Sequence, residues 1–230
     1  MSTTEEQTRA YEASHRRIDA LARQLNVEQL ATVVPCCPLW TVSDVIGHLT
    51  GLLEDRRDAN MAGDSFSAWT AAQVARQRDL SISQLLDKWS ELAAIDIDGP
   101  PSFAALSFDI VTHEHDIYQA LGVAGDRSTD SVAVGAERAR ARMSSMLTEG
   151  SAPGVLATTE DGTHLSEGAE APIGLEASRY VLLRLATGRM SRAQAQLLEW
   201  DSDPSPVLDA LFADGFFALQ PYDIAEVDGF

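Results

Sequence analysis

The chain has 230 residues, 45% of them hydrophobic, and its 17 basic and 35 acidic residues give a formal net charge of -18. Such a charge repels phosphate backbones and anionic lipid, so neither nucleic acid nor a membrane is an expected partner. No run of about eighteen apolar residues occurs and the first residues are polar, which predicts neither a membrane-spanning helix nor a signal peptide but a cytoplasmic protein.

The first 125 residues predict four helices. We expect them at about residues 4–25, 42–60, 81–94 and 102–121. Thr41 with Asp44, and Ser81 with Gln84, have the spacing of capping boxes at two of the helix starts. Prolines 35 and 38 indicate a loop before the second helix. Four helices with moderate connections predict a bundle, and facing helices in a bundle core often build metal sites.

After Asp126 the pattern changes to that of a small α+β domain. Residues 132–147 predict a helix, and residues 155–165 predict a hairpin about an Asp-Gly turn. Further helices are expected at 174–186, shortly after Ser191, and at 204–213. We therefore predict a mainly α chain with a helical domain at 1–125 and an α+β domain at 126–230.

His48 lies on the apolar face of the second predicted helix. The apolar stripe of this helix consists of Val42, Val45, Ile46, Leu49, Leu52 and Leu53. His48 follows Val45 by three residues and precedes Leu52 by four, so its side chain is expected to point along the buried face.

The fourth predicted helix carries a second pair of polar residues on its apolar face. Its stripe consists of Phe103, Leu106, Ile110, Ile117 and Leu121. His113 falls between Ile110 and Ile117, and Asp109 lies one turn before His113 on the same side. Two imidazoles and a carboxylate facing inward from two helices make a three-ligand set for a catalytic metal, with a fourth position open.

Each of these polar residues also has an ordinary structural interpretation. A single inward histidine is more often a hydrogen-bonded core residue than a ligand, although burying Asp109 beside His113 without a cation or other partner is costly. Asp116 would either orient a ligand imidazole or cap local polar groups. His115 points away from His113 and is expected to be exposed or bonded to a partner. The adjacent cysteines at 36 and 37 are expected to be two small loop residues, with a thiol-exchange role as the alternative.

Three segments resemble the mycothiol-dependent maleylpyruvate isomerase family, within the DinB/YfiT-like metalloenzymes. Residues 35–49, with the pattern CP-x-W-T-V-x-D-V-x-x-H-L, are similar to its first motif. Residues 109–122 match its E-x-x-x-H-x-x-D-x-x-x-A-L-G stretch except that Asp109 replaces glutamate. Residues 187–194 and 200–204 are similar to its C-terminal domain, so the resemblance spans nearly the whole chain.

The resemblance implies a DinB-like four-helix bundle followed by a sterol-carrier-like domain. It also implies zinc, or another divalent metal, held by His48, Asp109 and His113, with mycothiol as cosubstrate. The shorter aspartate would bind the metal directly if the helices lie closer, or else through water. Arg189 would bind an anionic group of the substrate or thiol, because guanidinium suits carboxylates, unless it is a helix cap or surface ion pair.

The resemblance predicts a thiol-dependent enzyme acting on a small electrophile. A thiolate that adds to a conjugated double bond gives isomerisation when it leaves again and a thioether when it stays, so isomerase and S-transferase both remain possible. The alternatives are a metal-dependent hydrolase and a non-catalytic binding or stress-response module, the latter suggested by the aspartate at position 109. Substrate, native metal and oligomeric state stay open, and loops such as 61–69 are expected to shape the pocket.

Overall fold

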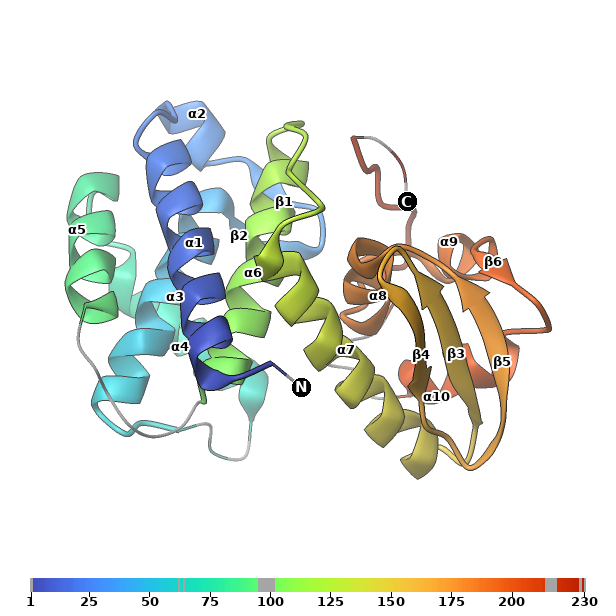
Figure 1. The fold of residues 1–230 in the computed structure, drawn as a ribbon. Coiled ribbons are helices and arrows are strands. Elements are labelled where there is room, and N and C mark those ends of the chain that lie inside the picture. The colour runs from blue at the N-terminus through green and yellow to red at the C-terminus, as the bar shows by residue number, and fades with distance from the viewer. Residues whose placement is uncertain are drawn as a thin grey trace. The chain divides into compact units, whose positions relative to one another are not determined.

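The computed structural model describes the chain except for residues 1, 62, 64, 95–101, 214–218, 228 and 230, and the side chain of Phe103. The described part is mainly helical with a small sheet, as predicted (Figure 1). It divides into two compact units, one formed by Thr3–Gly125 and the other by Met1–Ser2 with Asp126–Phe230. None of the described helices combines the length and apolar character needed to cross a membrane.

The first unit is built from helices and one short hairpin. Its helices are α1 (Thr4–Ala22), α2 (Val27–Leu30), α3 (Val42–Arg57), α4 (Phe66–Gln77), α5 (Ile82–Ala93) and α6 (Phe103–Ala120). Strands β1 (Val33–Val34) and β2 (Cys37–Thr41) pair antiparallel just before α3. The loop predicted at residues 35–38 is confirmed only at 35–36, the turn of this hairpin, because residues 37 and 38 belong to β2. The first helix is expected to reach about residue 25, but α1 ends at Ala22.

The start of α3 is fixed by the predicted capping box. The Thr41 hydroxyl accepts a hydrogen bond from the Asp44 backbone N–H at 3.2 Å, and Asp44 Oδ2 accepts one from the Thr41 N–H at 3.1 Å. This reciprocal pair satisfies two backbone donors that a helix start leaves open. The cap therefore sets where the helix begins and places His48 in its second turn.

The helix α4 is absent from the sequence-based prediction, which expects a loop at 61–69 and no helix between about residues 60 and 81. The buried side chains of α4 are Thr70, Gln73, Val74 and Gln77. Because three of these four are polar, the helix shows no hydrophobic stripe and its period gives no signal. The predicted pocket loop thus includes the first turn of α4.

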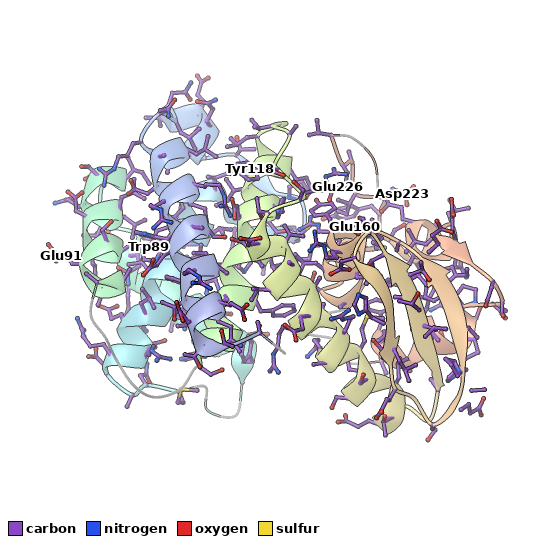
Figure 2. The ribbon with its side chains drawn as sticks, viewed as in Figure 1. Trp89, Glu91, Tyr118, Glu160, Asp223 and Glu226 are labelled. Carbon is purple, nitrogen blue, oxygen red and sulfur yellow. The ribbon has the colours of Figure 1, made fainter. Side chains whose placement is uncertain are left out.

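An apolar core joins α1, α3, α5 and α6. Trp89 of α5 is fully buried in it, and the indole N–H donates to the Tyr11 hydroxyl at 3.0 Å. Figure 2 shows Trp89 reaching from α5 toward α1, whereas Glu91 on the same helix points outward. The apolar cluster that contains Trp89 also includes Ile18, Ile46, Leu49, Leu85, Leu86, Leu106 and Ile110. The helices that carry the predicted metal ligands are therefore anchored in one core.

The second unit combines a sheet with helices. Its elements are α7 (Asp130–Glu149), β3 (Pro153–Thr159), β4 (Gly162–Ser166), β5 (Glu170–Glu176), α8 (Arg179–Ala186), α9 (Arg192–Gln196), β6 (Glu199–Trp200) and α10 (Ser205–Leu211). The strand order is β4-β3-β5-β6, and only the β3–β5 pair is parallel.

The helix predicted at 174–186 begins later than expected. Residues 170–176 form β5, where Ile173 and Leu175 lie opposite Val155 and Ala157 of β3, and Ser178 caps α8 instead. At Gly174 an added Cβ would lie 2.5 Å from an Asp201 carboxylate oxygen. The apolar residue Leu175 that suggests a helix therefore contributes to the sheet. The predicted 155–165 hairpin is confirmed as β3 and β4, which are joined by a turn at residues 160–161. Gly162, the first residue of β4, has φ +127°.

Candidate metal centre

The structure brings His48 of α3 together with Asp109 and His113 of α6. One potential ligand atom from each residue lies within 4.8 Å of the other two. His48 Nε2 is 3.3 Å from Asp109 Oδ2, and His113 Nε2 is 3.7 Å from Asp109 Oδ1. The three residues singled out by helical spacing are thus adjacent in space, on two helices that contact each other.

This donor set has dimensions suited to a tetrahedral metal ion. Zinc bonds of about 2.0–2.1 Å to nitrogen and oxygen place tetrahedral ligand atoms about 3.3–3.4 Å apart. The 3.3 Å from His48 Nε2 to Asp109 Oδ2 matches this spacing, and the 3.7 Å from His113 Nε2 to the other carboxylate oxygen, Oδ1, exceeds it by a few tenths. The aspartate carboxylate therefore reaches both imidazoles although it is one methylene shorter than glutamate.

Both imidazoles are buried, whereas the carboxylate faces partly outward. His48 and His113 are 3% and 5% exposed, while the Asp109 side chain is 30% exposed. Burial by itself lowers the pKa of His113, but the negative charge of Asp109 and the contact with Asp116 outweigh burial and raise that pKa to about 10. The cluster thus strongly favours a positive charge at its centre, whether that charge is a proton or a metal ion.

The opposite edge of the His113 ring, at Nδ1, lies near Asp116 and Cys37. His113 Nδ1 lies 3.0 Å from Asp116 Oδ2, and the Asp116 side chain is fully buried. Cys37 of β2 joins these two in a second group whose potential ligand atoms lie within 4.8 Å of one another. The predicted proximity of Asp116 to a ligand imidazole is present, whereas the sequence gives no sign that Cys37 lies beside it.

Trp40 of β2 covers the two histidines. Its ring centroid is 4.9 Å from that of His48, at an interplanar angle of 34°, and 6.1 Å from that of His113. The residue that precedes the α3 cap therefore packs against the pair of candidate ligands. An indole in this position limits the access of water to the imidazoles.

Two polar residues that the sequence does not predict to be site residues complete the surroundings of His48. Gln73 Oε1 of α4 lies 2.7 Å from His48 Nδ1, and Gln73 Nε2 donates to Asp55 Oδ2 at 2.7 Å. Asp55 follows His48 by seven residues, two turns along the same helix face, and this spacing is a usable signal. Gln73 has no such signal, because the helix that carries it is itself missing from the prediction.

The two remaining polar residues of the prediction lie elsewhere. His115 is 3% exposed, with its ring 5.8 Å from that of Tyr118, so the expectation of an exposed side chain is wrong and the partner-bonded alternative stands. Arg189 belongs to the second unit, is 8% exposed, and donates from Nη1 to the Thr187 carbonyl at 2.7 Å. Its part in substrate binding stays a prediction.

Comparison with known proteins gives one family and two related structures. The family model described as the mycothiol maleylpyruvate isomerase N-terminal domain matches residues 11–166, more than half of the chain, and extends past Gly125 into the second unit. None of the curated proteins matches the chain significantly in sequence.

Two solved structures that resemble the chain carry descriptions related to this family. A mycothiol-dependent maleylpyruvate isomerase is 13% identical with a TM-score of 0.57, covering 88% of this chain and 94% of its own. A histidine-to-alanine mutant of an enzyme with the same description is 14% identical with a TM-score of 0.54, covering 82% and 90%. At such identities the likeness shows a shared fold.

Proposed function

This chain belongs to the mycothiol maleylpyruvate isomerase family, and from that premise we propose that it is a zinc-dependent enzyme that uses mycothiol, or a similar small thiol, on a small electrophile. The expected membership of an enzyme family is confirmed by the family match. The observation that carries the proposal is the proximity of three potential ligand atoms, one each from His48, Asp109 and His113, which lie within 4.8 Å of one another. The descriptions of the two related structures support a thiol as cosubstrate.

The finer architecture is part of the same proposal. We assign α1, α3, α5 and α6 to a DinB-like four-helix bundle, because these four helices share one apolar core. We assign the second unit to a sterol-carrier-like domain, because it packs helices with a four-stranded sheet. The predicted cytoplasmic location also remains a proposal.

The residues of the candidate centre fit a bound divalent metal. His48, Asp109 and His113 would hold the ion and leave one position for a ligand. Zinc bound there would lower the pKa of a thiol cosubstrate, so that the thiolate is available at neutral pH. Asp116, 3.0 Å from His113 Nδ1, would orient that imidazole. Trp40 would keep water from the two rings.

The chemistry of the thiol then decides between two reactions. The thiolate sulfur adds to one carbon of a conjugated double bond, which becomes a single bond about which the substrate rotates. Loss of the same thiolate restores the double bond in the other geometry, so the thiol is regenerated. If the adduct takes up a proton instead, a thioether remains, and the enzyme is an S-transferase. Arg189 is proposed to bind a carboxylate of the substrate or the thiol.

The test combines metal analysis with turnover. We expect about one zinc per chain in the purified protein, lost in His48→Ala and Asp109→Ala, and conversion of maleylpyruvate as a probe only when mycothiol is added. Zinc with turnover that needs no thiol would replace the proposal by a metal-dependent hydrolase. A wild-type protein that takes up no zinc and catalyses no thiol-dependent reaction would replace it by a binding or stress-response module.

A further inference from the structure

A buried chain of polar groups runs from His48 through Gln73 to Asp55. The three residues are 3%, 0% and 2% exposed, so water cannot replace the hydrogen bonds between them. His48 Nδ1 meets Gln73 Oε1 at 2.7 Å, and Gln73 Nε2 meets Asp55 Oδ2 at 2.7 Å. Leaving a buried polar group without a partner is costly, so each donor in this series must meet an acceptor. The partners therefore show which atoms carry hydrogens.

The Asp55 end of this series of hydrogen bonds fixes the orientation of the Gln73 amide. Asp55 Oδ1 accepts hydrogen bonds from Arg76 Nη2 at 2.5 Å and from Asn60 Nδ2 at 2.8 Å. These two donors occupy one oxygen of Asp55, and the other oxygen, Oδ2, faces the side-chain amide of Gln73. Only the amino group of Gln73 can donate to it, so the amide oxygen must face His48.

The orientation of the amide in turn fixes the proton of His48. An amide oxygen can only accept, so His48 Nδ1 must carry a hydrogen and donate it. In the neutral ring the lone pair then lies on Nε2, the nitrogen that is 3.3 Å from Asp109 Oδ2. Free histidine prefers the opposite tautomer, with the hydrogen on Nε2, and that tautomer could not bind a metal through Nε2.

The spacing between α3 and α4 makes this contact possible. Gly51 lies against Gln73 so closely that an added Cβ would be 2.7 Å from Gln73 Cβ, whereas at Gly47 an added Cβ would be 3.3 Å from Gln77 Cβ. A side chain at position 51 would push Gln73 away from His48. The glycine thus contributes to the geometry of a residue one turn before it.

We propose that Gln73, oriented by Asp55, is a positioning residue that holds His48 in the Nδ1–H form and so presents Nε2 to the metal. The inference rests on the proposed function, because the lone pair on Nε2 matters only if a metal ion binds at the candidate centre. Gln73 contacts Nδ1 of His48, the ring nitrogen that faces away from Asp109. Its effect on metal binding is transmitted through the His48 ring.

The tautomer can be observed directly by nitrogen-15 NMR of the wild-type protein. The chain has five histidines, so selective labelling gives a spectrum that His48→Ala can assign. We expect Nδ1 of His48 to bear a slowly exchanging hydrogen both before and after zinc is added. A hydrogen on Nε2 of the zinc-free protein with Nδ1 bare would overturn the inference.

A matched pair of variants tests the consequence for metal binding. Gln73→Met removes the acceptor at similar volume, and we expect zinc affinity to fall about 10–100-fold, the usual effect of losing a partner behind a ligand histidine. Gln77→Met is the control, because Gln77 lies one turn later on the same buried face but bonds to Glu54 and Lys88. Equal losses in the two variants would mean that Gln73 acts only through packing.

A second variant keeps the test valid if Gln73→Met folds poorly. Asp55→Asn keeps the shape but removes the charge that orients the amide, so we expect a smaller loss of affinity and a mixture of tautomers. An unchanged single Nδ1–H tautomer in this variant would contradict the role of Asp55. Failure of the proposed function looks different, because wild-type protein that binds no zinc would still show the Nδ1–H form.

Discussion

The two sides of α3 are stabilised in different ways. Toward α5 and α6 it presents Ile46 and Leu49, which pack into the apolar core around Trp89. Toward α4 it presents Gly47, Gly51 and polar groups that meet the glutamines of α4. Burial of apolar area stabilises the first side without regard to direction, whereas the second is stable only if each hydrogen bond is made. One side of the helix therefore stabilises the fold, and the other side orients the His48 ring.

The largest loss of zinc binding is expected when a candidate ligand on α6 is removed. His113→Ala should abolish zinc binding and thiol-dependent turnover, because no other described side chain supplies a nitrogen at that point. The substitution also leaves the buried Asp116 without its imidazole partner, so the free energy of unfolding should fall as well. Metal analysis and thermal unfolding of the same preparation check this, and a variant that retained stoichiometric zinc would refute the ligand assignment.

Truncation in the apolar core should lower the stability of the protein without removing the metal site. Trp89→Ala removes a fully buried indole and its hydrogen bond to Tyr11, so we expect the free energy of unfolding to fall by about 3–5 kcal/mol. Where the variant still folds, zinc affinity should change little. Denaturant unfolding gives the first quantity and zinc titration the second. Trp89→Phe, which keeps most of the apolar area, should recover much of the loss.

Between these extremes lies the contact of α3 with α4. Gly51→Ala inserts a methyl group 2.7 Å from Gln73 Cβ, and overpacking of this kind costs about 1–3 kcal/mol. We expect zinc affinity to fall with it, because Gln73 moves away from His48. Gly47→Ala is the matched control with a longer contact of 3.3 Å, and it should be better tolerated in both unfolding and zinc titration.

The smallest effect is expected when Asp109 is lengthened. Asp109→Glu keeps the carboxylate and restores the residue that the family pattern has at this position, so zinc affinity should change by less than about tenfold. Asp109→Ala should lose most zinc binding in the same titration. If the two variants lose zinc equally, the carboxylate has a spacing requirement stricter than the observed 3.3 and 3.7 Å distances suggest.

Helical period and capping chemistry predict the first of the two sides well. The stripes that contain His48 and His113 follow from apolar residues at three- and four-residue spacing, and the Thr41 cap follows from its own side chain. These signals are local, so a single sequence contains them. They are sufficient to bring His48, Asp109 and His113 onto facing helices.

The second side depends on information that no local pattern holds. The partners of Gln73 are an imidazole 25 residues away and a carboxylate 18 residues away, so its side chain has meaning only after α3 and α4 have packed. Cys37 meets His113 across an even longer separation. Strand β5 is a third case, because Leu175 suits a helix or a sheet and only pairing with β3 decides.

The imidazole of His113, held between two carboxylates, has a consequence for the stoichiometry of protons. With its pKa raised to about 10, the ring is protonated at neutral pH when no metal is bound. A metal ion needs the lone pair, so each ion taken up must release a proton to the buffer. The heat of metal uptake measured by calorimetry should therefore vary with the ionisation enthalpy of the buffer, and affinity should weaken as the solution is made more acidic.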